Sequence, residues 1–482
     1  MMDLTPRDPR RPLLWPDAVL DLQDALPDIG PAYIVGGAVR DAYLNRPIHD
    51  LDLATPEDPI ALGRRIANTL DGDFFVMDAE RGVARTLLQR PEGQLVIDVA
   101  AFRGPDLLAD LSDRDFTVNA MAVDLRDDLT LLIDPLGGEQ DINEKVLRRC
   151  GPASIADDPI RALRAVRQSV QFNLRIDPVT ISDIRAHAPR LEETSAERVR
   201  DEFFKLLALR KPATALRVAA AMDMLRVIVP ELPPLRDVSA PQPATGTAWD
   251  HTMRTVDKMA GILTTISPRR TDLTAAVFDL GMIVVALDRF RTPLQVHISQ
   301  NWPDDRTHEA LLQLAALLHL VNLPHIELDL AAQAGNRAAA LRLSGDERKR
   351  LSVAVGSFRE PLDMPTDDVS LHRFWRTHGA AGVDACLLGM AHFLGMDGAR
   401  DNQDGWVRLV EKMATILEAY FERYDEIVEP PVLIDGNTLM TALDLRPGRQ
   451  VGDLLTAIRE AQVGGTVRTV DDALALARRL LD

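Results

Sequence analysis

The stretch IVGGAVRDAYLNRPIHDLD, residues 34–52, combines a short apolar run, two adjacent glycines and two aspartates separated by one residue. Its β-branched start, together with the preceding Tyr33, predicts a strand. Gly36 and Gly37 predict a tight turn that leaves room for a ligand beside the main chain. Residues 39–44 predict a short helix whose exposed amide groups suit a phosphate, and residues 50–53 predict the next strand.

The two aspartates of this second strand define the chemistry of the stretch. Alternate side chains of a strand share a face, so Asp50 and Asp52 point the same way while Leu51 and Leu53 point into the core. Two neighbouring carboxylates repel unless a cation lies between them, and Mg²⁺ takes oxygen ligands while leaving positions for substrate phosphates. The pattern predicts nucleotidyl transfer with two ions roughly 3.5–4 Å apart. A βαβ turn with surface aspartates is the alternative.

Length, composition and charge exclude several classes of protein. At 482 residues the chain is long enough for several domains. It has no apolar run of membrane length, no signal-peptide core, and only two cysteines, which are too few for a disulfide framework. We therefore expect a reduced, cytoplasmic protein with no membrane partner. The net charge of −18 argues against indiscriminate coating of nucleic acid.

One segment has the opposite charge balance. Residues 148–217 contain fourteen Lys or Arg and nine Asp or Glu. An RNA backbone could dock on such a segment. Solvated helix faces would explain the same counts.

Apolar patterns predict further strands and one helix between residues 60 and 133. Strand-like runs occur at residues 74–76, 85–88 and 95–99, and a Leu-rich run at 129–133 predicts another strand; residues 60–70 have helical apolar spacing. Asp98 alternates with apolar residues and becomes a third carboxylate if its strand lies beside that of Asp50. From about residue 148 the pattern is helical.

Three motifs resemble the family of class II tRNA nucleotidyltransferases and bacterial poly(A) polymerases. The opening stretch is similar to the family's GGxVRDxxL…DxD, residues 110–122 resemble DLxRRDFTxNAxA, and residues 157–167 resemble EDPxRxLRAVRF. Two positions depart from the family pattern: Asp113 stands where an Arg is usual, and Asp157 where a Glu is usual.

The resemblance implies a role for each matched residue. Asp50 and Asp52 would hold Mg²⁺, the expected cofactor, and would be catalytic together with Asp98. The residues implied to bind the nucleotide are Gly36, Gly37, Arg40, Arg114, Asp115, Asn119, Asp158, Arg161 and Arg164. The residues implied to support the site are Asp157, Glu197 and Arg198.

Residues 157–161 are predicted to open a helix, with acidic residues and a proline in its first turn. Asp158 and Arg161 would then share a face, and the family uses this acid and arginine to read the incoming base. Cytosine and adenine both present an amine beside a bare ring nitrogen, so a carboxylate can accept from the first and an arginine can donate to the second. Uracil and guanine present a carbonyl and an N–H at these two positions, so neither contact could form. A helix start with surface ion pairs is the alternative.

The family resemblance also implies an α+β fold class. An N-terminal head similar to the DNA polymerase β nucleotidyltransferase fold, with a mixed β-sheet, would be followed by an elongated all-α remainder. The predicted parts are a catalytic head at residues 1–147, a helical neck with the base-recognition helix and an RNA-binding surface at 148–230, a helical body at 231–425, and a helical tail at 426–482.

The predicted body resembles a degenerate HD-type domain. Leu320 occupies the position of the metal-binding Asp in that domain's His-Asp pair. We therefore expect no phosphohydrolase site, and we expect His251 and His319 to pack or to form hydrogen bonds.

The implied function is template-independent addition of CCA to tRNA 3′ ends, with CTP and ATP as substrates. A poly(A) polymerase, or an enzyme adding only CC or only A, shares the same motifs and remains an alternative. A non-catalytic RNA-binding relative is the alternative from a different class. Nothing in the sequence indicates a protein partner.

Overall fold

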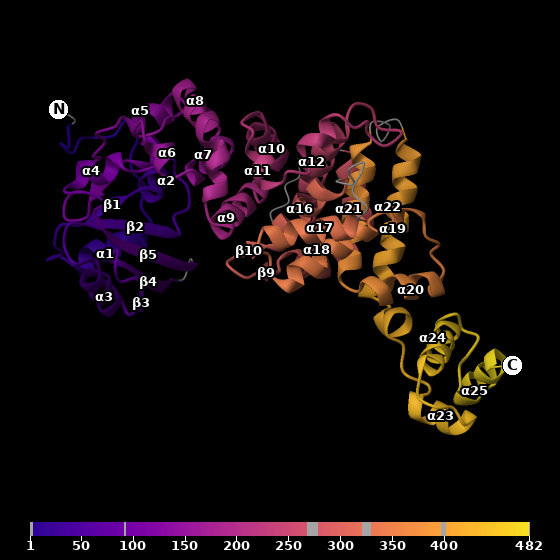
Figure 1. Cartoon of the computed structure of the whole chain (residues 1–482). Coiled ribbons are helices and arrows are strands. Elements are labelled where there is room, and N and C mark those ends of the chain that lie inside the picture. Colours follow the sequence, from indigo (N-terminus) through magenta and orange to yellow (C-terminus); the bar gives the residue numbers. More distant parts are fainter. Residues whose placement is uncertain (1–2, 91–92, 268–277, 321–328, 397–401, 482) are drawn as a thin grey trace. The chain divides into compact units, whose positions relative to one another are not determined.

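A computed structural model describes the chain except for residues 1–2, 91–92, 268–277, 321–328, 397–401 and 482. The chain forms two compact units, residues 1–194 and 195–482 (Figure 1). Their boundary falls inside residues 148–230, the predicted neck, so the division into four parts stays a prediction. None of the helices in the described part of the chain is both long and apolar enough to cross a membrane.

The N-terminal unit is built on a six-stranded mixed sheet with strand order β3-β4-β5-β2-β1-β6. Strands β2 and β5 pair in parallel, and the other neighbours pair antiparallel. The mixed sheet predicted for the head is confirmed. The strands are β1 (Tyr33–Val35), β2 (Asp50–Thr55), β3 (Asp73–Asp78), β4 (Val83–Arg90), β5 (Gly93–Ala101) and β6 (Ala122–Asp124).

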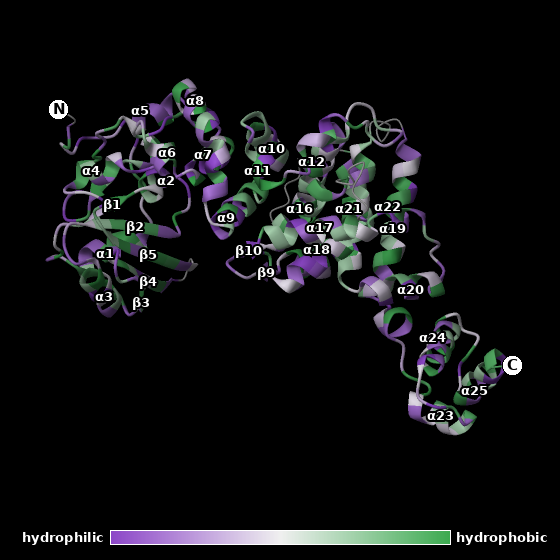
Figure 2. Cartoon of the chain, in the orientation of Figure 1, coloured by the Kyte–Doolittle hydropathy of each residue, from purple (hydrophilic) through white to green (hydrophobic). Residues whose placement is uncertain are grey.

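One face of the sheet is apolar and covered by helix α3 (Pro59–Leu70). Leu51 and Leu53 are both 1% exposed. Gly63 lets α3 approach β4 closely, because a Cβ atom at this glycine would lie 2.9 Å from the Cβ of Ala84. Burial of this apolar surface is the main favourable term in forming the sheet. Figure 2 shows hydrophobic residues along the strands of the sheet. On β2 the exposed Asp50 and Asp52 alternate with buried leucines and therefore lie on the opposite face.

The remaining elements of the unit are short. They are α1 (Asp17–Ala25), α2 (Gly37–Tyr43), α4 (Leu107–Ser112), η1 (Thr117–Asn119), α5 (Gly138–Asn143), β7 (Val146–Leu147), α6 (Ser154–Asp157), α7 (Ile160–Phe172), β8 (Arg175–Ile176), α8 (Pro178–His187) and η2 (Ala188–Glu193).

The strand predicted at residues 129–133 is wrong. Leu132 and Ile133 form only isolated bridges, because the segment before them turns. The Asp128 side chain accepts hydrogen bonds from the backbone N–H and the hydroxyl of Thr130, at 2.9 and 2.7 Å. Local side-chain bonds of this kind compete with extended pairing.

The single helix predicted to begin at residue 157 is also wrong. Helix α6 ends at Asp157, and α7 begins only at Ile160. Asp158 lies between them in an extended conformation, with φ −140° and ψ 96°. The proline that follows disfavours the helical conformation for Asp158. Asp158 and Arg161 therefore do not sit one turn apart on a continuous helix.

The C-terminal unit is mostly helical, with one short hairpin. Its elements are α9 (Ala196–Leu207), α10 (Pro212–Ala221), α11 (Met224–Ile228), η3 (Pro233–Arg236), α12 (Ala248–Ile266), α14 (Phe278–Leu287), η4 (Asp288–Phe290), α15 (Arg291–Ile298), β9 (Asn301–Trp302), β10 (Arg306–Thr307), α16 (His308–Leu318), α17 (Leu330–Ala340), α18 (Gly345–Ser357), α19 (Glu360–Asp363), α20 (Asp368–His378), α21 (Ala381–Gly395), α22 (Gln403–Phe421), η6 (Tyr424–Val428), α23 (Gly436–Leu443), α24 (Arg449–Val463) and α25 (Val470–Leu481).

Two groups of helices in this unit bury apolar side chains. Helices α12, α16 and α21 contact one another, and every residue of α16 except Glu309 is buried. The last three helices share a separate small core that includes Leu439, Leu454 and Ala473. The predicted succession of a mixed-sheet head and a helical remainder is therefore confirmed.

Candidate active site

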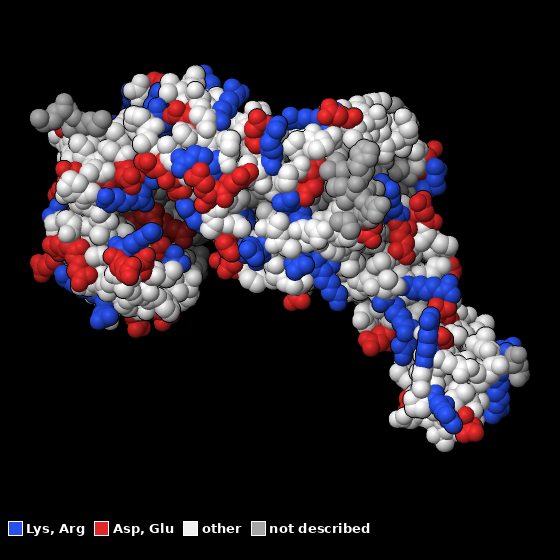
Figure 3. Space-filling view, viewed as in Figure 1, with Lys and Arg blue, Asp and Glu red and all other residues white. Residues whose placement is uncertain are grey.

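The polar face of the sheet presents the predicted aspartates. Asp50 and Asp52 are exposed and alternate along β2 with the buried Leu51 and Leu53. They therefore point to the same side, as their spacing predicts. Figure 3 shows acidic side chains gathered in a hollow of the N-terminal unit.

Asp98 joins this face because β5 pairs in parallel with β2. Asp52 and Asp98 are direct partners in the register of the two strands. On the other side of β5, Arg85 of β4 pairs with Asp98. Its guanidinium donates to both carboxylate oxygens, from Nε to Oδ1 at 2.8 Å and from Nη2 to Oδ2 at 2.8 Å. Arg85 thus offsets part of the negative charge.

Gly36 brings the main chain against the carboxylates. Its backbone has φ +78° and ψ −138°, a conformation that favours glycine. A Cβ atom here would lie 3.0 Å from Oδ2 of Asp52 and 3.0 Å from Nη1 of Arg114. The glycine turn, one aspartate of β2 and one arginine of the second motif therefore meet at one point.

Arg114 is held in this position by Asp110. The buried Asp110 carboxylate accepts hydrogen bonds from Nε and Nη2 of Arg114 at 3.1 and 2.9 Å, and from the backbone N–H of Arg103 at 3.1 Å. Asp113, which departs from the family pattern, lies beside Arg103, with Oδ2 3.7 Å from Nη1. A positive group thus faces the acidic strand from the loop after α4.

The surroundings of Asp52 favour its protonated form. Its side chain is exposed, yet the surrounding protein removes the carboxylate partly from water, which raises its pKa above the usual 3.8. The charge of Arg114 lowers the pKa, whereas Asp98 and Asp50 raise it. The net direction is upward, as expected for a carboxylate cluster that a cation would stabilise.

The carboxylate cluster suits hard cations. It offers oxygen ligands only, side by side and open to solvent, which matches the preference of Mg²⁺. Among the described residues, two groups of three side chains bring ligand atoms within 4.8 Å of one another, and both contain histidines and lie in the C-terminal unit. The three aspartates do not converge so closely, since Asp98 bonds to Arg85 and like charges repel.

Arg40 braces the glycine turn from behind. Its guanidinium donates from Nε and Nη2 to the two carboxylate oxygens of Asp41 at 3.1 and 2.8 Å, and from Nη1 to Oδ1 of Asn119 at 2.5 Å. It also stacks on Phe172, 4.1 Å from the ring centroid. Gly37 is in contact with it, since a Cβ there would lie 3.3 Å from its Nη2.

Asp115 is the centre of a buried hydrogen-bond network. It accepts from Nδ2 of Asn119 at 2.8 Å, from Nε of Arg164 at 2.9 Å and from Nε2 of Gln168 at 3.3 Å. Burial alone would raise its pKa, but the Arg164 charge and these hydrogen bonds lower it. Asp115 is therefore an ionised link between the second motif and helix α7.

Arg161 links the same two segments through the backbone. Its guanidinium donates to the carbonyl oxygen of Asp113 at 2.9 Å and to the hydroxyl of Ser154 at 3.1 Å. Asp158 is half-buried at the end of α6, and the neighbouring Asp157 is exposed. The predicted base-reading residues thus surround the break between α6 and α7.

The two supporting residues lie in the other compact unit. Glu197 and Arg198 belong to the first turn of α9, which Ser195 caps by accepting from the backbone N–H of Arg198 at 3.4 Å. Both side chains are exposed. Their predicted support of the base-reading helix stays a prediction.

Three residues that hold side chains of the candidate site in place were not predicted from the sequence. Arg85 contacts Asp98, Asp110 contacts Arg114, and Gln168 contacts Asp115. Arg85 alternates with buried residues on β4, which was a signal for a polar face. Asp110 stands in the second motif, so its position was visible although its partner was not. Gln168 had no signal, because only the packing of α7 brings it to Asp115.

Comparison with known proteins identifies two family models in the chain. The poly A polymerase head domain matches residues 32–107 and 105–148. The probable RNA and SrmB-binding site of polymerase A matches residues 173–235.

Relatives of similar length match nearly the whole chain. The CC-adding tRNA nucleotidyltransferase of Synechocystis sp. is 39% identical over 453 residues, covering 93% of each chain. That of Geobacter sulfurreducens is 31% identical, covering 92% of this chain and 90% of its own. The A-adding tRNA nucleotidyltransferase of Deinococcus radiodurans is 30% identical, covering 94% and 96%.

Solved structures share the fold. A CCA-adding enzyme in complex with CTP has a TM-score of 0.65 at 20% identity and covers 100% of both chains. The Thermotoga maritima CCA-adding enzyme complexed with tRNA has a TM-score of 0.58 at 20% identity and covers 97% of this chain and 95% of its own.

The contact at Gly36 predicts that Gly36→Ala weakens Mg²⁺ binding. The added methyl group would displace Asp52 or Arg114 by a few tenths of an ångström, and disturbed support of ligands costs about 10–100-fold in metal affinity. Gly137→Ala is the control, because Gly137 also has positive φ, +77°, but a Cβ there meets nothing within 4 Å. Calorimetric titration should show the loss only in the first variant; equal affinities in both would contradict the placement of Gly36.

The raised pKa of Asp52 predicts a pH dependence of Mg²⁺ binding. Only the carboxylate form binds the ion, so affinity is full above this pKa and falls as the pH drops through it. Because the pKa lies above 3.8, the fall should begin at a higher pH than for an ordinary aspartate. Calorimetry across a pH series checks this, with Asp52→Asn expected to bind weakly and with a flatter profile. A wild-type affinity that stays constant down to about pH 4 would contradict it.

Proposed function

The chain belongs to the family of class II tRNA nucleotidyltransferases and bacterial poly(A) polymerases and is a nucleotidyltransferase, and from this premise we propose that it adds CCA to tRNA 3′ ends from CTP and ATP. The observation that carries the proposal is the meeting of Asp52, Gly36 and Arg114 on the polar face of the sheet. The names of the relatives support tRNA as the acceptor.

Asp50 and Asp52 are the proposed ligands of two Mg²⁺ ions, with Asp98 as a third carboxylate. When bound, the ions would lower the pKa of the attacking 3′ hydroxyl and neutralise charge on the triphosphate. Asp98 can contribute to this site once Arg85 exchanges its carboxylate for another anion. A triphosphate supplies such an anion, so Arg85 is a candidate for binding it.

The phosphate-binding role falls to Gly36, Gly37 and Arg114. Gly37 is half-buried, so part of its main chain stays accessible at the corner. Asp110 holds Arg114 by two of its nitrogens, while Nη1 lies close to the buried Gly36. Arg40 donates to Asp41 and Asn119, so its contribution to phosphate binding is proposed to be the rigidity of the corner. As in other phosphoryl transfers, the protein mainly positions reactants and stabilises charge.

Recognition of the sugar and base is proposed for the second motif and helix α7. Asp115 and Asn119 form the floor beneath the sugar, and Asp158 with Arg161 selects the base, supported by Arg164. The carboxylate of Asp158 accepts from the exocyclic amine of cytosine or adenine, and Arg161 donates to the adjacent ring nitrogen. To do so, Arg161 exchanges its bond to the Asp113 carbonyl for one to the base.

The helical segments after the head are proposed to hold the tRNA. The basic excess in residues 148–217 overlaps the family model named for RNA binding, which matches residues 173–235. We retain the four predicted parts, head, neck, body and tail, as the proposed functional division of the chain.

Addition of only CC is the second candidate. Two relatives that cover more than nine tenths of this chain are CC-adding enzymes, at 39% and 31% identity. The same motifs are proposed to bind CTP for the first two additions and ATP for the last. The described contacts are therefore compatible with a CC product and with a CCA product.

Stepwise incorporation separates the candidates. The purified protein is incubated with Mg²⁺ and one labelled nucleotide at a time. The tRNA substrates lack CC, end in a single C or end in CC, and the products are resolved by length. We expect CTP to extend the shortest tRNA by two residues and ATP to extend the CC-ended tRNA by one. Extension by CTP alone would favour the CC-adding function, long A tails would favour a poly(A) polymerase, and no extension would contradict the proposal.

Substitution of Asp52 tests the role of the acidic face. Asp52→Asn keeps the side-chain size and removes a charge, so we expect incorporation to fall about a thousandfold or more, from several kcal/mol of lost charge stabilisation. The melting temperature should not fall, because like-charge repulsion is relieved. Asp73→Asn makes the same chemical change on the edge strand β3 and should retain activity. Near-normal turnover of Asp52→Asn would contradict the metal assignment.

A further inference from the structure

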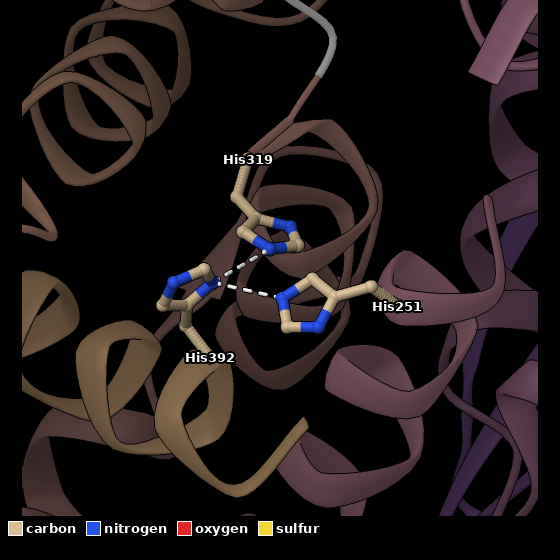
Figure 4. Close-up of side chains that lie close together, drawn as sticks. All are labelled: His251, His319 and His392. Carbon is tan, nitrogen blue, oxygen red and sulfur yellow. Dashed lines mark hydrogen bonds between the residues drawn. The ribbon is translucent and has the colours of Figure 1, made fainter. Parts of the chain in front are cut away.

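Three histidines from distant parts of the sequence meet inside the C-terminal unit (Figure 4). His251 lies in α12, His319 follows α16 as its C-terminal capping residue, and His392 lies in α21. Their side chains are buried, with 0%, 0% and 5% exposure. None of them is among the residues proposed for nucleotidyl transfer, and all three belong to the C-terminal unit.

The ring nitrogens of the three histidines converge. Nδ1 of His392 lies 3.0 Å from Nε2 of His251 and 3.1 Å from Nε2 of His319. One ligand atom of each residue lies within 4.8 Å of those of the other two. Zinc–nitrogen bonds of ~2.0–2.1 Å place tetrahedral ligands ~3.3 Å apart. Two of the observed separations are within a few tenths of an ångström of that value.

Backbone carbonyls fix the tautomers of two of these rings. Nδ1 of His251 lies 3.2 Å from the carbonyl oxygen of Gly395, and Nδ1 of His319 lies 2.8 Å from that of Ala316. A carbonyl oxygen only accepts, so each Nδ1 carries the proton and each Nε2 has its lone pair directed inward. This outer hydrogen bond is the arrangement that orients histidines as metal ligands.

The burial of the cluster keeps the rings neutral. Removal from water, together with the neighbouring histidines, lowers the pKa of His319 well below 6.5. Burial, His251 and the charge of Arg359 lower the pKa of His392 to about 3. Neutral imidazole is the form that binds metals.

The packing around the cluster also brings its helices close together. A Cβ atom on Gly395 would lie 2.7 Å from Oγ1 of Thr255 and 3.2 Å from Cε1 of His251. The Phe358 ring packs edge-on against His319 and His392, with centroids 5.4 and 5.0 Å away. These contacts enclose the cluster within the helices of the C-terminal unit.

We infer that His251, His319 and His392 bind one transition-metal dication, with Zn²⁺ as the expected ion, and that this ion joins helices α12, α16 and α21. Three imidazole nitrogens suit zinc, cobalt or nickel and not the hard ion Mg²⁺. The fourth ligand of a tetrahedral site is left to water. With no carboxylate in the set, the site differs from the His-Asp pair whose loss at Leu320 the sequence shows.

A second histidine group in the same unit lacks these properties. The Asp384 carboxylate accepts from Nε2 of His297 at 2.7 Å and Nε2 of His308 at 2.9 Å, and it also pairs with Arg350. The arginine already neutralises the carboxylate, and a metal ion would be repelled by it. This group is therefore a buried hydrogen-bonded ion pair and provides a matched control.

Cobalt titration of the full chain tests the inference. The protein is stripped with a chelator and titrated with Co²⁺ in excess Mg²⁺, which occupies oxygen-ligand sites. We expect one equivalent to give the intense visible absorption of tetrahedral Co²⁺, added Zn²⁺ to abolish it, and either ion to raise the melting temperature. His392→Gln should weaken binding at least about 10–100-fold, whereas His297→Gln should keep the one-equivalent band.

Failure of the metal-site inference can be told apart from misfolding of a variant and from failure of the proposed nucleotidyl transfer. Should His392→Gln not fold, His392→Cys supplies a replacement ligand and should retain the visible band with an added thiolate-to-cobalt absorption, which a merely packed residue cannot produce. A stripped wild-type protein that gives no tetrahedral spectrum, or a His392→Gln variant that binds like the wild type, would overturn the inference. Neither result depends on nucleotide incorporation.

Discussion

The parallel pairing of β2 with β5 is the constraint on which the N-terminal unit depends. It places Asp52 directly beside Asp98 on the polar face, while Leu53 and Val99, the next pair in register, are buried on the other. The apolar face thus stabilises an arrangement that concentrates negative charge. Burial is the main cause of the raised pKa of Asp52, Arg114 lowers that pKa, and Asp98 and Asp50 raise it. This concentration of carboxylates is the basis for proposing a cation site on the face.

The network around Asp115 connects this face to the segment proposed to select the base. Asp115 contacts Asn119 in the loop and Arg164 on α7, and Asn119 in turn contacts Arg40 behind the glycine turn. All these groups are charged or polar and most are buried, so a displacement of α7 would leave donors or acceptors unpaired, at a cost of about 1–3 kcal/mol each. The segment proposed to select the base and the corner proposed to hold phosphates are therefore joined by one hydrogen-bond network.

Local pattern was sufficient to predict the acidic face of β2, the family resemblance implied the fold of the head, and the contacts between side chains of different strands were not predictable. Alternation along residues 50–53 was enough to place Asp50 and Asp52 on one face, because a strand has a strict period of two. The Arg85–Asp98 pair depends on antiparallel register between strands, which the sequence does not specify. The break at Asp158 could have been inferred from Pro159 alone. The acidic residues and the proline, read as a first helical turn, favoured a continuous helix instead. The histidine cluster joins residues 141 apart, beyond the reach of any periodic signal.

The most direct test of the account is a crystal structure of the protein soaked with Mn²⁺ and a non-hydrolysable CTP analogue, with the metal located by anomalous scattering. The account predicts two peaks roughly 3.5–4 Å apart, both bound by oxygens of Asp50 and Asp52 and in contact with the analogue's phosphates beside Gly36. A triphosphate bound elsewhere in the chain, or no metal beside β2 at saturating Mn²⁺, would contradict it.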